Sequence, residues 1–366
     1  MKKKLLLGGL LFLVLTSCSS VEKTEDFVSG VKNIRGGVIQ PLNTTVFLRT
    51  YNKQVFNNLF PSYKQIIQRI HKESDRYNEY SDYSDIYKLN RDGYIQTNDE
   101  VIEMLENVLE FSSLTDYKFN PALGPLIDVW TPLFNNSNNN DPSSVEINDA
   151  LGNIPLTNIE DYFDIDKDAK TIGRLDENIT LDLGAYAKGY ALDKAYEAFK
   201  DDDNPLMIYA GGSSIILKGT KPYANGNWII DIDNPDNFMT SIAQLYLQGT
   251  NYLSTSGDYQ RYFINESGIR RHHILNPFTG YPADNYRSIT VYADGRADIL
   301  DALTTALFNC ENDEEFLELI SKVEKRYSIN IEFVYVKESV DGLYLGVSED
   351  AEDVIKNPKV EVRVIK

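Results

Sequence analysis

The amino-acid sequence predicts an α+β fold, with mixed, largely antiparallel sheets and helices packed around them. Short segments of strand character follow one another at the spacing of hairpins. Segments with helical periodicity gather in a few places and do not alternate regularly with the strands. This segregation favours α+β over a doubly wound α/β fold. We expect one compact body over residues 38–366.

The first 37 residues differ in composition from this body. Three lysines precede the apolar run Leu5–Leu15, which is shorter than the roughly 20 residues of a spanning helix. This pattern predicts a secretory signal peptide over residues 1–17. The Leu-Thr-Ser-Cys sequence that ends at Cys18 is similar to the bacterial lipobox, so we expect Cys18 to be lipidated; an ordinary signal peptide with an incidental cysteine is the alternative. Residues 18–37 would then be a polar tether.

Charge and cysteine content narrow the class of protein. The formal net charge is −19 at pH 7, and loss of the three leader lysines would make it −22. Such a surface repels nucleic acid, so we expect no nucleic-acid partner, and a phosphate-bearing ligand would need a metal ion or backbone N–H groups. Cys310 is the one cysteine after Cys18, so the body has no disulfide. We expect an exported protein, lipid-anchored to a membrane of the bacterial cell envelope.

In the first half of the chain, periodicity and capping residues predict few regular elements. Asn98 is a helix cap. The tyrosine-rich loop 77–85 includes Tyr80, which is either a ligand platform or an exposed loop residue. Residues 119–133 contain too many prolines for a regular element, and Trp130 within them either closes the core or forms a pocket wall. Strands are expected at 45–52, 163–166 and 171–175, helices at 61–77 and 98–113, and a polar excursion at 135–148.

The second half of the chain begins with two stretches that could contact a ligand. Residues 179–199 pass from a strand into a helix and bring Asp182 and Lys188 to the junction; the alternatives are a simple cap for Asp182 and a solvated Lys188. Residues 205–215 are expected to form a buried strand that ends in two glycines, where backbone would approach a ligand closely. Further strands are expected at 228–233, 242–247, 252–254, 288–293, 331–336, 343–347 and 360–365, and helices at 298–307 and 314–325.

Residues 252–284 carry the densest set of polar turns. Ser254–Asp258 offers hydroxyls and backbone N–H groups that suit phosphate oxygens, although an ordinary hairpin turn has the same composition. His272 and His273 are neighbours in a predicted strand, where successive side chains point to opposite faces. At most one of the two histidines can therefore face a given site.

The helix over 298–307 carries Asp301 and Thr305 four residues apart, so both oxygens lie on one helical face. Two hard oxygens one turn apart can contribute to a magnesium or calcium site. A plain polar helix face is the alternative.

Five stretches together resemble the ApbE family of flavin transferases. Each has a short pattern of glycine, hydroxyl or acidic residues, and they occur in the same order as in the family. They lie at residues 181–190, 210–212, 255–259, 273–282 and 301–307. The resemblance covers nearly the whole body and implies an ApbE-like, T-fold-like catalytic body.

The resemblance implies a magnesium-dependent transfer of the FMN part of FAD to a threonine or serine hydroxyl of another exported protein, with release of AMP. The implied acceptors are exported flavin-carrying proteins, such as subunits of sodium-pumping or related electron-transport complexes. Two alternatives use the same pocket: a magnesium-dependent FAD pyrophosphatase that gives FMN and AMP, and a non-catalytic flavin-binding lipoprotein.

The resemblance also implies roles for individual residues. The metal ligands would be the backbone carbonyl of Ala185 and the side chains of Asp301 and Thr305, with Thr304 nearby. His273 is the candidate base, and Asp258 is a second candidate. Contacts to the flavin, the nucleotide and the phosphates are expected from Leu42, Tyr80, Trp130, Asp182, Lys188, Gly211, Gly212, Ser256, Gly257 and Leu275.

Overall fold

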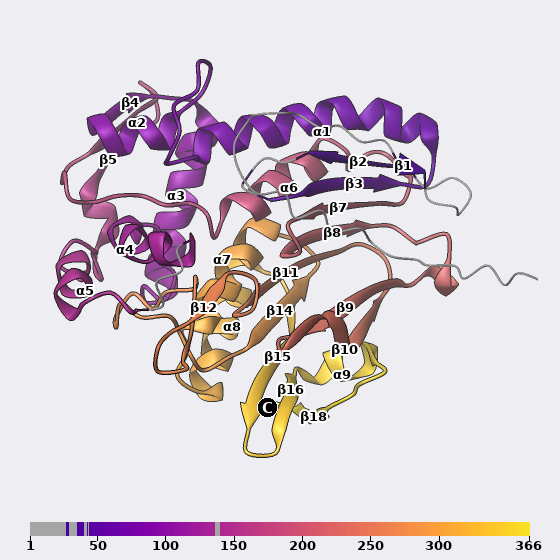
Figure 1. The fold of residues 1–366 in the computed structure, drawn as a ribbon. Helices are drawn as coiled ribbons and strands as arrows, with labels where there is room; N and C mark the ends of the chain where they lie inside the picture. Colours follow the sequence, from indigo (N-terminus) through magenta and orange to yellow (C-terminus); the bar gives the residue numbers. More distant parts are fainter. Residues whose placement is uncertain (1–26, 29–34, 40–41, 43, 136–139) are drawn as a thin grey trace, which may run out of the picture.

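A computed structural model describes residues 27–28, 35–39, 42, 44–135 and 140–366 (Figure 1). The predicted signal peptide and the predicted lipidation site Cys18 lie outside the described residues, as does most of the predicted tether. Among the helices that are described, none combines the length and the apolar character needed to cross a membrane.

The described residues form one large sheet of ten strands, in the order β1-β2-β3-β7-β8-β11-β14-β15-β16-β18. Neighbouring strands are antiparallel except for β16 and β18, which are parallel. The strands are β1 (Phe27–Val28), β2 (Arg35–Ile39), β3 (Val46–Thr50), β7 (Leu206–Ala210), β8 (Ser214–Lys218), β11 (Asn251–Gly257), β14 (Ser288–Ala293), β15 (Ile331–Ser339), β16 (Gly342–Val347) and β18 (Glu361–Val364).

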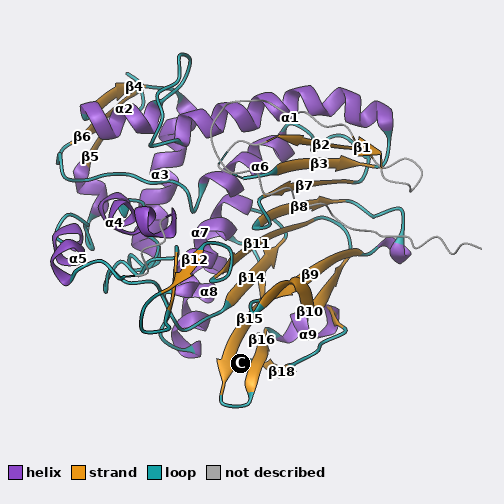
Figure 2. Ribbon diagram, viewed as in Figure 1, coloured by secondary structure: helices purple, strands orange, loops and turns teal. Residues whose placement is uncertain are grey.

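Three smaller sheets accompany it. Their strands are β4 (Tyr94–Gln96), β5 (Phe163–Asp166), β6 (Thr171–Arg174), β9 (Trp228–Asn234), β10 (Asn237–Leu247), β12 (Tyr262–Ile264), β13 (Arg270–His272) and β17 (Ile355–Lys356). The β12–β13 hairpin lies between the helices around α4 and those around α7 and α8 (Figure 2). Sheets dominated by antiparallel pairs, with helices beside them, confirm the predicted α+β class.

The helices gather in two places, as Figure 1 shows. Helices α2 to α5 and the β4–β6 sheet form a lobe at one side of the large sheet, whereas α6 and α7 pack directly on that sheet. The helices are α1 (Lys53–Ser74), α2 (Asp85–Asp92), α3 (Asp99–Leu114), α4 (Gly124–Asn135), α5 (Ser144–Leu151), α6 (Ala187–Glu197), α7 (Ala297–Phe308), α8 (Asp313–Tyr327) and α9 (Glu349–Val354), with 3₁₀ turns at Ile159–Tyr162 and Ala224–Gly226.

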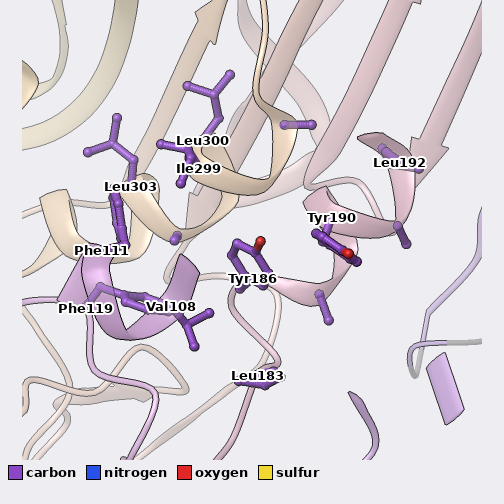
Figure 3. Packing of buried hydrophobic residues seen from close by; sticks show 14 of the residues in the cluster. Val108, Phe111, Phe119, Leu183, Tyr186, Tyr190, Leu192, Ile299, Leu300 and Leu303 are labelled. Carbon is purple, nitrogen blue, oxygen red and sulfur yellow. The ribbon is translucent and has the colours of Figure 1, made fainter. Parts of the chain in front are cut away.

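The two faces of the large sheet bury separate cores. One face packs against α1, α3, α6, α7 and α8, and the other packs against β9, β10 and α9. Figure 3 shows Tyr186, just before α6, and Tyr190 of α6 beside residues of α3 and α7 within the first core. Burying a large apolar side chain contributes about 1.5–3 kcal/mol, so this core fixes α6 and α7 firmly relative to the sheet.

A glycine allows α6 and α7 to approach each other closely. A Cβ atom on Gly189 would lie 2.1 Å from the carbonyl oxygen of Ala297. A larger residue would therefore force the two helices apart. This contact matters because both helices contribute to the candidate site.

Some predicted elements are wrong in the first half of the chain. Helix α1 begins at Lys53 and not at Pro61, because Asn52 caps it by accepting hydrogen bonds from the main-chain N–H groups of Gln54 and Val55. Residues 124–135 form α4, although the prolines predicted an irregular segment. Pro125 lies in the first turn of α4, where a missing N–H costs little, whereas Pro132 lies inside the helix.

Two other segments also differ from the prediction. The excursion predicted over 135–148 includes the start of α5, whose Ser143 and Glu146 form a capping box. Residues 179–183 form no strand with a neighbour. Instead the side-chain amide of Asn90 pairs with the main chain of Leu181 in both directions, at 2.8 Å each.

Candidate functional site

The site centres on Asp301, where α7 crosses β8 and β11. Its side chain is 4% exposed. Oδ1 accepts hydrogen bonds from Oγ of Ser214 at 3.1 Å and of Ser254 at 3.4 Å, and Oδ2 accepts one from the N–H of Gly189 at 3.1 Å. Ser214 and Ser254 are register partners on β8 and β11, so the sheet itself orients this carboxylate.

Lys188 lies beside this carboxylate. Its Nζ is 3.4 Å from Oδ2 of Asp301 and donates a hydrogen bond to the carbonyl oxygen of Gly184 at 2.8 Å. Lys188 is thus an ordered part of the site and not a solvated side chain. The ammonium group occupies a point between a carboxylate and a main-chain carbonyl next to Ala185, which is a position suited to a cation.

The hydroxyls predicted near the metal lie along the same helix. Oγ1 of Thr304 donates to the carbonyl oxygen of Asp301 at 3.0 Å, and Oγ of Ser256 donates to Oγ1 of Thr304 at 2.9 Å. Thr305 is half-buried, one helical turn after Asp301. In the part of the chain that the structure describes, no group of three or more His, Cys, Asp or Glu residues gathers as a metal site. The predicted magnesium ligands would not appear as such a group, because Asp301 is the single carboxylate among them.

Asp182 shapes the turn before α6. Its Oδ1 accepts the N–H of Gly184 at 2.8 Å, so it closes a local turn and does not cap the helix. Its Oδ2 lies 3.6 Å from Nη1 of Arg76, which is almost completely buried and also pairs with Asp128. These contacts fix the turn that presents the carbonyl group of Ala185.

The single strand predicted over 205–215 is wrong, because β7 ends at Ala210 and a turn leads into β8, and this turn needs its two glycines. Gly211 and Gly212 have φ of +63° and +78°, a region that other residues rarely adopt. The N–H of Gly211 donates to the carbonyl oxygen of Thr45 at 2.8 Å, so that amide is not free for a ligand.

Gly257 presents its amide on the other side of this turn. The N–H of Thr255 donates to the carbonyl oxygen of Ser213, just before β8. In a strand, N–H groups two residues apart face the same neighbour, so the N–H of Gly257 points past the end of β8.

The two adjacent histidines have opposite environments. His272 is 3% exposed and its Nε2 lies against the carbonyl oxygen of Ala283, and burial lowers its pKa to about 3. His273 is exposed to solvent, and partial desolvation by the neighbouring protein nevertheless lowers its pKa to about 4. The positive charges of Arg261 and Lys188 act in the same direction. As the strand alternation predicted, only one of the pair is accessible.

His273 is also held by the main chain of Arg261, just before β12. Its own N–H donates to the carbonyl oxygen of Arg261 at 3.2 Å, and Nδ1 lies 3.3 Å from the same oxygen. A hydrogen on Nδ1 would satisfy that contact and leave the lone pair of Nε2 available as an acceptor.

Asp258 is enclosed by two guanidinium groups. Its Oδ1 is 2.9 Å from Nη1 of Arg270, and its Oδ2 is 2.6 Å from Nε of Arg287. Burial raises the pKa of Asp258 above its ordinary value, and the two arginines oppose that shift. Both carboxylate oxygens are therefore occupied.

Trp130 and Leu275 support the turn after His273. Trp130 is fully buried, and its Nε1 donates to the carbonyl oxygen of Gly280 at 2.9 Å. Leu275 is 4% exposed and forms an antiparallel bridge with Pro282. Both side chains belong to the same buried cluster as Phe263 of β12.

Tyr80 and Leu42 make their contacts away from Asp301. The hydroxyl of Tyr80 donates to Oδ2 of Asp75 at 2.6 Å and lies 3.3 Å from Nε2 of His71, at the end of α1. Leu42 is half-buried against the first core and has φ of +57°. Neither residue has a recorded contact with Asp301 or Lys188.

Sequence reasoning missed the partners that orient the site. Ser214, Ser254 and Gly189 all hydrogen-bond to Asp301, and Arg76 holds Asp182. Ser254 and Gly189 lie in stretches that the sequence singled out, but nothing in the sequence indicated their contacts with Asp301, because these depend on which elements become neighbours.

Comparison with known protein families shows which family this chain belongs to. The model described as the ApbE family matches residues 42–329. The chain belongs to the ApbE family. This confirms the resemblance stated from the five motifs.

Individual relatives agree with this assignment. An FAD:protein FMN transferase from Klebsiella pneumoniae is 31% identical over 211 residues, which are 57% of this chain and 61% of that relative. The chain thus spans about three fifths of that relative's length in the matched part. An ApbE protein structure from Thermotoga maritima superposes with a TM-score of 0.73 at 26% identity, covering 88% of this chain and 99% of that one.

A second solved structure supports the fold alone. The flavin transferase ApbE from Vibrio cholerae gives a TM-score of 0.69 at 20% identity and covers 88% of this chain and 99% of its own. The ApbE architecture is therefore common to the three proteins.

Proposed function

We propose that this ApbE-family protein transfers the FMN part of FAD to a threonine or serine hydroxyl of another exported protein and releases AMP. Family membership and the relatives named FAD:protein FMN transferase support the proposal. The observation that carries it is the ammonium of Lys188 between Oδ2 of Asp301 and the carbonyl oxygen of Gly184. A site that binds a pyrophosphate in a strongly acidic protein needs a local positive charge of this kind.

The donor set fits magnesium. Asp301, Thr305 and the main-chain carbonyl of Ala185 would hold the ion, and all three offer the hard oxygens that it prefers. When bound, magnesium would offset the negative charge of the pyrophosphate and make the attacked phosphorus more electrophilic.

The chain's own groups would bind and orient the pyrophosphate. Lys188 is already fixed by Asp301 and Gly184, so its ammonium group can contact a phosphate oxygen with little further ordering. The N–H groups of Gly257 and Gly212 would add neutral donors. Removing one donor of this kind typically slows a reaction about 10²- to 10³-fold.

His273 would take the proton of the acceptor hydroxyl. Its lowered pKa keeps the imidazole neutral at pH 7, and Nε2 has an available lone pair. The hydroxyl oxygen forms a bond to the phosphorus of the FMN half, the bond to the bridging oxygen breaks, and AMP leaves with that oxygen. We do not assign this role to Asp258, because both of its oxygens are held by arginines.

The acceptor and the location are further parts of the proposal. A lipid on Cys18 would hold the enzyme at a membrane of the bacterial cell envelope. The family resemblance points to exported flavin-carrying subunits of sodium-pumping or related electron-transport complexes as acceptors.

FAD pyrophosphatase activity is the second candidate, with water in place of the hydroxyl. The solvent access of His273 favours it, because a water molecule can reach the same base. The products would be FMN and AMP without a modified protein.

Mass spectrometry distinguishes these reactions. The full-length protein is incubated with FAD, Mg²⁺ and a purified acceptor domain, and Asp301→Asn serves as the control. A gain of one FMN mass on the acceptor, lost in the control, supports the transferase. FMN and AMP with an unmodified acceptor support the pyrophosphatase, and intact FAD in both samples contradicts both activities.

A further inference from the structure

Asp258 connects the end of β11 to the hairpin that carries His273. On one side it follows Ser256, whose hydroxyl donates to Thr304 on α7. On the other side it pairs with Arg270, the first residue of β13. The same carboxylate thus lies between the part of the site around Asp301 and the part that contains the base.

Arg270 depends on this contact. Among the ion pairs recorded for the described residues, its carboxylate partner is Asp258, at 2.9 Å. Its other contacts are a 3.3 Å hydrogen bond from Nη1 to the carbonyl oxygen of Pro235 and a position 4.5 Å above the ring of Tyr262. Tyr262 is the register partner of His272 in the β12–β13 hairpin. The guanidinium therefore braces both strands next to His273.

Arg287 does not depend on Asp258 in the same way. Besides Asp258, it pairs with Asp236 at 2.7 Å and with Glu338 at 2.9 Å. Loss of the Asp258 carboxylate would leave Arg287 with two acidic partners. Arg270 would have no acidic partner among those found in the described residues. The effect of removing this carboxylate should therefore concentrate on β13.

We propose that Asp258 is a positioning residue that fixes His273 relative to the Asp301 side of the site. Asp258 acts through Arg270 and does not itself touch the reacting atoms. The inference rests on the proposed transfer reaction and explains why a buried acid pairs with two arginines so close to the site. A base displaced by about 1 Å can lose about 10² in rate, so small movements of the hairpin are sufficient.

A double-mutant cycle tests this role. Single-turnover transfer by the full-length protein is measured for Asp258→Asn, His273→Ala and the double variant, with FAD affinity measured separately. Asp258→Asn alone should slow transfer about 10- to 100-fold and leave the Kd for FAD within about twofold. In the His273→Ala background the same change should slow transfer less than about threefold, because a base that is absent cannot be displaced.

Asp236→Asn is the matched control. It removes an exposed carboxylate from Arg287 but leaves both Asp258 and Arg270 in place. It should leave transfer within about twofold of the wild type. If Asp258→Asn fails to fold, Arg270→Gln replaces it in the cycle, since the proposal predicts the same dependence on His273.

Each outcome has one meaning. Equal slowing by Asp258→Asn with and without His273 would overturn the inference, as would an equal loss in Asp236→Asn. A wild-type protein that transfers no FMN would instead contradict the proposed function, and this result is visible before any variant is compared.

Discussion

The two sides of the candidate site differ in how much of their structure exists before a substrate binds. On the α7 side, Asp301 is buried and hydrogen-bonded by two strand serines and a helix N–H. On the hairpin side, His273 is open to solvent and is held through the main chain of Arg261. The difference indicates that the Asp301 side is preorganised, while the His273 side stays accessible, which suits the large acceptor of the proposed reaction.

The largest expected effect comes from the buried side. Asp301→Asn keeps the shape of the side chain but removes its charge, so the Mg²⁺ requirement should no longer be met. We expect transfer to fall at least about 10³-fold, because the charge on the pyrophosphate would lose its main compensation. Steady-state rates against Mg²⁺ concentration measure this. Asp294→Asn, an exposed change just before α7, should be silent, and an Asp301→Asn variant with near-normal rates would remove this carboxylate from the mechanism.

The accessible side should show a smaller loss. His273→Ala removes the proposed base, and we expect transfer to slow about 10²- to 10³-fold. Thermal unfolding should change little, because the ring is exposed. The check is single-turnover transfer with a purified acceptor, and unchanged turnover would mean that His273 is not the base.

The pH profile sharpens the comparison further. Since desolvation lowers the pKa of His273 to about 4, the imidazole is the neutral base at all higher pH values. The transfer rate should therefore fall only as the pH drops towards about 4, and not near the unperturbed value of about 6.5. The profile is measured at saturating FAD and Mg²⁺, and His273→Ala should lack this limb. A midpoint near the ordinary histidine value would contradict the environment described for this ring.

The smallest expected effect comes from Trp130, which supports the turn after His273. Trp130→Phe keeps an aromatic ring in the core but removes the N–H that binds the carbonyl oxygen of Gly280. An unsatisfied buried acceptor costs about 1–3 kcal/mol, so we expect a lower melting temperature. Transfer at 25 °C should fall only a few-fold. Chemical denaturation gives the stability change, and a loss as large as that of His273→Ala would show that Trp130 acts in the reaction itself.

Sequence reasoning found the regular elements best where a cap or an alternating pattern was strong. Asn98 begins α3 as predicted, and the strand at 288–293 has the predicted bounds. It failed at α4, where prolines suggested an irregular segment although Pro125 occupies a tolerated position in the first turn. Local sequence could not show that the surrounding core would stabilise this helix.

The candidate site followed the same pattern. Asp301 and Thr305 were recognisable from helical spacing and from the family motifs. The serines that orient Asp301 were not, because Ser214 and Ser254 become neighbours only through the pairing of β8 with β11. Likewise, Asp258 was predicted as a possible base, but its two arginine partners were not predicted. Arg270 and Arg287 lie 12 and 29 positions later in the chain. Contacts of this range depend on topology and are not readable from composition or spacing.

The most direct test of the difference between the two sides is FAD binding, measured by isothermal titration calorimetry with and without Mg²⁺. In the wild type and in His273→Ala, Mg²⁺ should strengthen FAD binding by the same factor. In Asp301→Asn, Mg²⁺ should have no effect on FAD affinity. A His273→Ala variant that loses the Mg²⁺ effect, or an Asp301→Asn variant that keeps it, would contradict the account.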